Sequence, residues 1–211
     1  MFKKYRATIV ICAILCLLPI LVGVYYWNEL PDMMVTHWDM HNQPNGYMPK
    51  AVAVFLLPVL MAALLFLCPL AAKIDPKKPT YNDKMIAIML WTMPVMSLLL
   101  SAMTYGWALG FEFDIGFWVT VFLGIVFVLI GNYLPKCTPS FTMGIKLPWT
   151  LSDDENWRKT HRMAGPIWVF GGVLIIVSSF LKITWMMLPA ILIMVFAPTV
   201  YSYCYYRKHN K

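Results

Sequence analysis

Two groups of polar side chains in this 211-residue chain could support chemistry. The first group is His37, Asp39 and His41, and imidazole and carboxylate are ligand types that suit zinc. The two histidines would share a face only in a helix, which the surrounding turn-forming residues argue against. A fourth ligand would have to come from Glu29 or Asp32 through folding. We therefore expect no metal site here.

The second group is Asp153, Asp154, Glu155 and His161, which could act as acid, base or metal ligands. Ser152 is the nearest candidate nucleophile, but on a helix it would lie more than two turns from His161, beyond hydrogen-bond reach. The three acids also have a simpler explanation at a helix start. We expect no catalytic residues, no enzymatic activity and no cofactor.

The acids fit the first turn of a helix that begins near residue 152. Ser152 followed by Glu155 is a capping-box pattern, and carboxylates there meet the positive end of the helix dipole. Asp154 with Arg158, and Glu155 with Lys159, are spaced as i, i+4 pairs, each worth roughly 0.3–0.5 kcal/mol on an exposed helix. The pattern predicts a helix that starts in water.

One face of this helix is less polar. Trp157, His161 and Ala164 fall at i, i+4 and i+7, and Gly165-Pro166 is expected to interrupt the helix. The result would be a short amphipathic helix at the membrane interface, in front of a span. It could anchor that span with Trp157 in the lipid headgroups, or it could form a docking or sensing surface; the pattern leaves both open.

The chain that must position these groups is mostly apolar. Its residues are 60% hydrophobic and 13% charged, whereas soluble domains carry about 25% charged residues. Six stretches approach the roughly 20 residues that a helix needs to cross a bilayer core of about 30 Å, and none contains Asp, Glu, Lys, Arg or His. We predict an all-α integral membrane protein with six transmembrane helices, at residues 7–27, 51–72, 85–109, 115–134, 163–181 and 185–206.

Lysine and arginine indicate the orientation, because they are enriched in cytoplasmic loops. Alternating spans place fifteen of the seventeen on the side that holds both termini. Both termini are therefore expected in the cytoplasm, with residues 28–50 outside and residues 135–162 inside. The net charge of +7 reflects this topology and attraction to anionic membrane lipid, and we expect no direct nucleic-acid binding.

Residues 28–50 are too patterned to be a simple connection. Residues 33–38 could be a short extended piece, and Gln43-Pro44-Asn45-Gly46 is a turn signal. We expect two modules: residues 1–72, a two-helix module with this outer loop, and residues 73–211, a four-helix module with the inner loop 135–162. On the third span, Ser97, Ser101 and Thr104 form a polar stripe that favours helix–helix hydrogen bonds.

The inner loop and its flanks contain a set of motifs: Gly131-Asn132, the run from Met143 to Leu151, Trp157, and Thr160-His161-Arg162. Through these motifs the inner loop resembles the SdpI family of bacterial membrane proteins. The outer loop, with Leu30-Pro31, His37-Trp38-Asp39, Pro44-Asn45-Gly46-Tyr47 and Lys50, is similar to the amino-terminal module often joined to that family.

Two positions depart from these patterns. Lys146 stands where the family commonly has arginine, which removes the planar, bidentate contact that a guanidinium offers. Asn42 stands where the outer module usually has glycine. Because asparagine tolerates a left-handed backbone better than most residues, the turn can persist.

The resemblance implies immunity to a secreted killing peptide and capture of a cytoplasmic repressor at the membrane. The expected partners are thus membrane lipid, a secreted toxin peptide and a transcriptional repressor. For the peptide we expect contacts from His37, Trp38, Asp39, Pro44, Asn45, Gly46 and Tyr47. For the repressor we expect a docking face made of Asn132, Gly144, Lys146, Pro148, Trp149, Thr150, Asp154, Glu155, Trp157, Thr160, His161 and Arg162.

A transporter is the main alternative. Ion-coupled transporters retain ionisable residues inside the membrane, and the six predicted spans have none. An uncoupled carrier, or a general envelope-stress protein, for an apolar substrate remains the alternative function.

Overall fold

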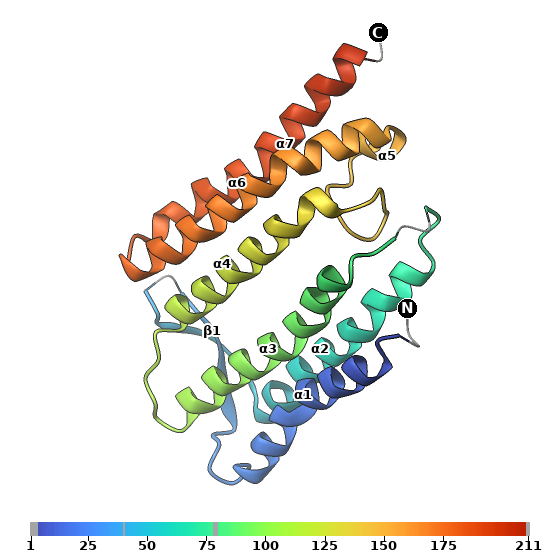
Figure 1. Ribbon diagram of the computed structural model, residues 1–211. Helices are drawn as coiled ribbons and strands as arrows, with labels where there is room; N and C mark the ends of the chain where they lie inside the picture. Colours follow the sequence, from blue (N-terminus) through green and yellow to red (C-terminus); the bar gives the residue numbers. More distant parts are fainter. Residues whose placement is uncertain (1–3, 40, 78–79, 210–211) are drawn as a thin grey trace. The chain divides into compact units, whose positions relative to one another are not determined.

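The structure is a computed structural model that describes residues 4–39, 41–77 and 80–209. It is mostly helical, and in the described residues six helices are long and apolar enough to cross a membrane (Figure 1). This confirms the prediction of six spans. The helices are α1 (Arg6–Tyr25), α2 (Lys50–Lys73), α3 (Asp83–Ala108), α4 (Ile115–Tyr133), α6 (Asp154–Phe180) and α7 (Met187–His209).

Five shorter elements lie between these helices. Strands β1 (Met33–Trp38) and β2 (Pro44–Pro49) separate α1 from α2. The 3-10 helix η1 (Leu134–Lys136) follows α4, the single-turn helix α5 (Pro148–Ser152) precedes α6, and the 3-10 helix η2 (Thr184–Met186) precedes α7.

The chain forms two compact units. Unit 1 comprises Met1–Leu70 and Met89–Gly116, and unit 2 comprises Ala71–Ile88 and Phe117–Lys211. Most of α3 therefore belongs with α1, α2 and the strands. The sequence modules expected on either side of residue 72 divide the chain differently and stay a prediction.

In unit 1 the two strands form an antiparallel hairpin. The extended piece expected at residues 33–38 is confirmed as β1, but the turn predicted at residues 43–46 is wrong, because Pro44, Asn45 and Gly46 lie in β2. The chain reverses earlier, where the Asp39 carboxylate accepts hydrogen bonds from the backbone N–H groups of His41 and Gln43, both at 2.8 Å. The proline and glycine pattern could not predict that the Asp39 side chain closes this turn.

The polar stripe of α3 faces the other helices of unit 1. Ser97 Oγ donates to the Cys16 carbonyl of α1 at 2.8 Å, and its side chain is fully buried. The Tyr105 hydroxyl donates to the Val54 carbonyl of α2 at 3.4 Å. Helix–helix hydrogen bonding is therefore confirmed for Ser97.

In unit 2, α4 and α6 approach through two pairs of glycines spaced seven residues apart on each helix. A Cβ at Gly131 would lie 2.9 Å from the Gly165 carbonyl oxygen, and one at Gly172 would lie 2.7 Å from the Gly124 carbonyl oxygen. Such distances leave no room for a side chain at either contact. The glycines thus allow the two helix backbones to pack directly, as small residues do between transmembrane helices.

The interruption expected at Gly165-Pro166 is wrong, because α6 is one helix of 27 residues with Pro166 inside it. Pro166 lacks an N–H, but a neighbouring helix in a membrane protein makes such a loss tolerable. Gly165 is used for close approach to α4. The expected amphipathic helix is therefore not a separate element; its residues form the first turns of α6.

We expect Gly172→Ala to destabilise unit 2 by about 1–3 kcal/mol, because the new methyl group would meet backbone atoms, which cannot rotate away. The matched control is Val173→Ala, since Val173 is exposed and its truncation should stay within about 0.5 kcal/mol. Thermal unfolding in detergent measures both. Equal melting temperatures for the two variants would contradict the close-packing argument.

Candidate functional site

Two polar segments outside the helical spans carry the predicted sites. We call residues 28–50 the hairpin loop and residues 135–162 the cassette segment. The hairpin loop lies in unit 1 and the cassette segment in unit 2.

The hairpin loop is held by side chains at both of its ends. Near the hairpin tip, the Asn42 amide N–H donates to the Phe113 carbonyl at 2.8 Å, and its Oδ1 accepts from the Ile115 N–H at 3.0 Å. At the base, Lys50 Nζ donates to the Trp27 and Leu30 carbonyls, both at 3.1 Å. These carbonyls belong to the loop just beyond α1, so the ammonium group satisfies backbone acceptors that no helix or strand pairs.

Asn42 has a second role, in the backbone. Its φ of 60° confirms the left-handed conformation inferred for this position. We expect Asn42→Gly to keep the turn but lose both contacts to residues 113 and 115, and Asn42→Ala to lose the contacts and also strain the backbone. Hydrogen exchange of the hairpin amides should therefore rise in Gly and rise further in Ala. Unchanged exchange in both variants would show that Asn42 does not fasten the hairpin.

The seven predicted peptide-contact residues divide by exposure. His37, Asp39, Asn45 and Tyr47 are exposed, and the His37 ring Nδ1 donates to Asn45 Oδ1 at 2.5 Å. The other three shape the hairpin: Trp38 packs edge-on against Trp107 with ring centroids 5.9 Å apart, and Pro44 and Gly46 are half-buried.

Asp39 is the turn-closing acid. Hydrogen bonds from the Gln43 and His41 N–H groups, with the charges of His41 and His37, lower the pKa of its carboxyl despite some desolvation. Among the residues that the structure describes, no three His, Cys, Asp or Glu side chains are placed to hold a metal ion.

The cassette segment enters α6 differently from the expected capping box. The N-cap is Asp153, whose carboxylate accepts from the N–H groups of Glu155 at 2.8 Å and Asn156 at 3.1 Å. An aspartate can satisfy these open donors without a reciprocal partner, so Ser152 is not needed as the cap.

The ion pairs of the first turn are partly as predicted. Glu155 contacts Lys159 Nζ at 3.0 Å, which confirms that pair. The predicted Asp154–Arg158 pair is wrong: Asp154 contacts Lys77 at 3.4 Å, and Arg158 lies 3.8 Å from Glu155. The Asp154 partner comes from the connection between α2 and α3, which local spacing cannot reveal.

Trp157, His161 and Gly144 form the core of the cassette segment. Trp157 and His161 are stacked, with centroids 4.1 Å apart, and are 1% and 0% exposed. The Trp157 indole N–H donates to the Cys137 carbonyl at 2.9 Å. Placement of Trp157 in the lipid headgroups is therefore wrong, because the indole is covered by the protein.

His161 fixes the loop in front of α5. Its Nε2 accepts from the Ile145 N–H at 2.8 Å, so the ring proton lies on Nδ1, which donates to the Trp157 carbonyl at 2.8 Å. Gly144 has a φ of +116°, and a Cβ there would lie 2.6 Å from the His161 ring. Glycine is required at this position both for the backbone and for the contact.

Two further buried side chains tie α5 and α6 to their surroundings. Thr150 Oγ1 donates to the Ile145 carbonyl at 2.8 Å and accepts from the Leu147 N–H at 3.0 Å. Asn156 Nδ2 donates to the Ser202 carbonyl of α7 at 3.1 Å. Its Oδ1 accepts from Thr160 Oγ1 at 3.0 Å.

Sequence reasoning missed Asp75, which is 4% exposed and whose carboxylate holds the loop at residues 140–142 through hydrogen bonds. Its Oδ2 accepts from Ser140 Oγ at 2.7 Å, from the Phe141 N–H at 2.8 Å and from the Thr142 N–H and hydroxyl, both at 3.0 Å. Its Oδ1 accepts from the Lys77 N–H at 3.0 Å. The partners in this loop lie 65 or more residues away, so no local pattern could have predicted them.

The twelve predicted docking residues therefore have different roles. Thr150, Trp157, Thr160 and His161 are buried and hold the segment together. Gly144 and Trp149 are half-buried, and Trp149 donates from its indole to Ser202 Oγ at 2.9 Å. The residues exposed to an incoming partner are Asn132, Lys146, Pro148, Asp154, Glu155 and Arg162.

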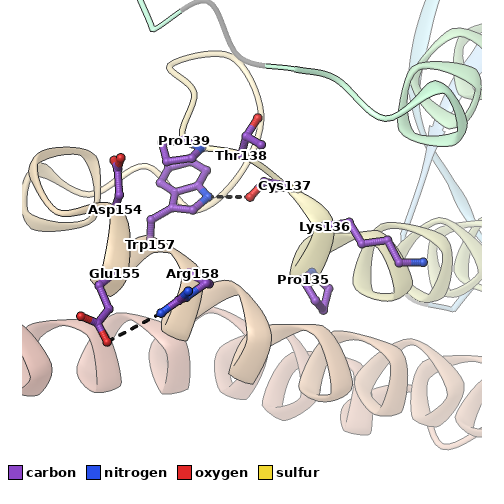
Figure 2. Close-up of a pocket in the computed structure, with 9 residues that line it drawn as sticks. All are labelled: Pro135, Lys136, Cys137, Thr138, Pro139, Asp154, Glu155, Trp157 and Arg158. Atoms are coloured by element: carbon purple, nitrogen blue, oxygen red, sulfur yellow. Dashed lines mark hydrogen bonds and ion pairs between the residues drawn. The ribbon is translucent and has the colours of Figure 1, made fainter.

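A pocket of about 450 Å³ is lined by two of these exposed residues, Asp154 and Glu155. One wall is the stretch from Pro135 to Pro139, and the other is the first turn of α6 with Asp154, Glu155 and Arg158. Figure 2 shows the Trp157 ring between the walls, with its N–H directed at the Cys137 carbonyl. The pocket has charged side chains on both walls and the covered indole between them.

Comparisons with known proteins match both segments. Residues 136–202 match the SdpI/YfhL protein family, and residues 14–62 match a domain of unknown function, DUF1648. The chain is 27% identical to the Immunity protein SdpI of Bacillus subtilis (strain 168), over 100% of this chain and 99% of the relative. No solved structure matches. With its six apolar helices, the chain is a multi-pass bacterial membrane protein, and its residues 136–202 are similar to the SdpI family.

Proposed function

We propose that the protein confers immunity to a secreted killing peptide at the bacterial cytoplasmic membrane, by binding and without catalysis. The observation that carries this proposal is the end-to-end similarity to a protein named as an immunity protein. A match over one segment alone would be weaker support for a shared function, because function resides in particular sites and not in the fold.

The orientation is part of the proposal. Fifteen of the seventeen lysines and arginines lie on the side of the termini when the six spans alternate, which supports cytoplasmic termini. Lys3, Lys78 and Lys211 belong to that set but lie outside the described residues. In this orientation the hairpin loop meets the extracellular peptide and the cassette segment faces the cytoplasm.

The hairpin loop suits peptide contact because it is rigidly fastened and carries exposed side chains. Asn42 and Lys50 hold it at tip and base, and Tyr47 is 55% exposed on β2. A fastened loop loses little conformational entropy on binding. Its exposed aromatic side chain offers a large apolar contact at small entropic cost.

The decisive test is survival of a peptide-sensitive bacterium that expresses the chain. We expect the full chain to protect and a Tyr47→Ser variant to protect less at matched membrane levels. Tyr25→Ser is the control, because Tyr25 is also exposed, at 80%, but lies at the end of α1 outside the hairpin loop. Failure of the full chain to protect against any killing peptide would contradict immunity. Equal loss in both tyrosine variants would contradict a specific role for the hairpin loop.

The second part of the proposal is a relay. The exposed residues of the cassette segment would capture a cytoplasmic repressor when the peptide is present. The buried Trp157 and His161 contacts keep this surface ordered. The alternative is an uncoupled carrier, or a general envelope-stress protein, for an apolar substrate; a carrier predicts export of the peptide from loaded vesicles, which immunity by binding does not.

A further inference from the structure

The pocket of Figure 2 has a surplus of positive charge once its ion pairs are assigned. Its two carboxylates contact lysines that do not line it: Asp154 contacts Lys77 at 3.4 Å, and Glu155 contacts Lys159 at 3.0 Å. These two acids are therefore already compensated from outside the pocket.

The positive charges of the two cationic residues in the pocket, Lys136 and Arg158, are less fully neutralised by acidic partners. Arg158 Nη2 lies 3.8 Å from the same Glu155 oxygen that Lys159 approaches to 3.0 Å, and its side chain is 73% exposed. A guanidinium carries five N–H donors in a planar fork that matches a carboxylate. Lys136 lies over the Tyr133 ring at 4.9 Å, a contact that leaves its charge in place.

The pocket also lies where a water-borne partner can reach it. The 27 residues of α6 extend about 40 Å, whereas a bilayer core takes about 30 Å. The charged residues of α6 all lie within residues 154–162, and none follows. The excess length is therefore at the Asp154 end, beyond the hydrocarbon region.

We propose that this pocket binds a carboxylate side chain from an acidic segment of a protein partner, with Arg158 as its main contact. The volume of about 450 Å³ falls within the range of about 300–1,000 Å³ that small-ligand pockets occupy. The non-ionic part of the lining, Pro135, Thr138 and Pro139, offers contact to a polypeptide beside the carboxylate. This inference rests on the proposed role of the cassette segment as a docking surface, and it names the chemistry of the partner.

The test uses the full chain in nanodiscs of neutral phosphatidylcholine and a fluorescent ten-residue glutamate-rich peptide. We expect the peptide to bind, and an otherwise identical glutamine peptide not to bind. Arg158→Gln should weaken binding about fivefold, the scale of one exposed ion pair, and Lys136→Gln should weaken it less. Arg207→Gln is the matched control, because Arg207 is exposed at the end of α7 and does not line the pocket.

Three outcomes would overturn the inference. The first is equal binding of the glutamate and glutamine peptides. The second is unchanged affinity in Arg158→Gln. The third is loss of peptide binding when the nanodiscs contain one third phosphatidylglycerol, provided that this loss depends on Arg158. That result would show that the pocket binds lipid phosphate. Circular dichroism of each variant confirms that the fold is retained.

The survival assay separates this inference from the proposed function. If the full chain and Arg158→Gln both protect but neither binds the peptide, the inference is contradicted and the proposed immunity is not. Peptide binding that depends on Arg158, with no protection by the full chain, would remove immunity and leave the pocket.

Discussion

Replacement of Trp157 by alanine will lower the free energy of unfolding by about 3–5 kcal/mol, the usual cost of deleting a large buried side chain. The indole is 1% exposed, stacks on His161 and donates to the Cys137 carbonyl. Its loss leaves a cavity, an unpaired carbonyl and a histidine ring without its neighbour. We expect unfolding in detergent at a clearly lower temperature than for the unmodified protein.

Trp157→Phe separates packing from hydrogen bonding. Phenylalanine retains much of the ring volume but cannot donate to Cys137, so a smaller loss of about 1–2 kcal/mol is expected. A Trp157→Ala variant that melts with the unmodified protein would show that the indole is not part of the core. Because the residue is structural, its substitution does not test repressor capture; substitutions at exposed Lys146 or Arg162 do.

The second large effect is expected at Asp75. Asp75→Ala removes the acceptor for four groups of the 140–142 loop and for the Lys77 N–H. Leaving such donors unsatisfied should cost about 3 kcal/mol. The loop precedes Gly144, so hydrogen exchange in residues 140–146 should increase.

Asp75 also makes stability depend on pH. Burial alone would raise the pKa of its carboxyl, but hydrogen bonds from Ser140, Lys77 and Thr142 outweigh it and lower the pKa from 3.8 to about 2. A lowered folded-state pKa stabilises the folded state fully above about pH 4, and this contribution, about 2 kcal/mol, is lost as the pH falls from about 4 to 2. Unfolding in detergent across that range measures it. Asp75→Asn should lack this component, and an identical pH dependence in both proteins would contradict the assignment.

The spans could be predicted because their signal is local. A run of about 20 apolar residues can hardly be satisfied except by a membrane helix, and each predicted span overlaps a helix of the structure. The strand at residues 33–38 and the left-handed Asn42 were also accessible from residue type. These features depend on neighbours a few positions away.

The errors arose where distant residues decide the structure. Gly165-Pro166 looks like a helix end by itself, but Gly165 accommodates α4. Asp154 has a good i+4 partner in sequence, yet Lys77 from another connection takes its place. The same cause hid the role of Asp75, whose partners in the 140–142 loop lie 65 or more residues away. Local spacing identified the cassette segment but could not say which of its residues are buried.

The unbroken course of α6 has a mechanical consequence. A helix of 27 residues that runs without a break extends about 40 Å, and a rigid-body tilt of about 3° about its Phe180 end would displace its Asp154 end by about 2 Å. A hinge at Gly165-Pro166 would have absorbed such a tilt. Because the helix continues through these residues, a tilt of α6 as a rigid body would carry a shift at its Phe180 end to Arg158 and its neighbours at the other end.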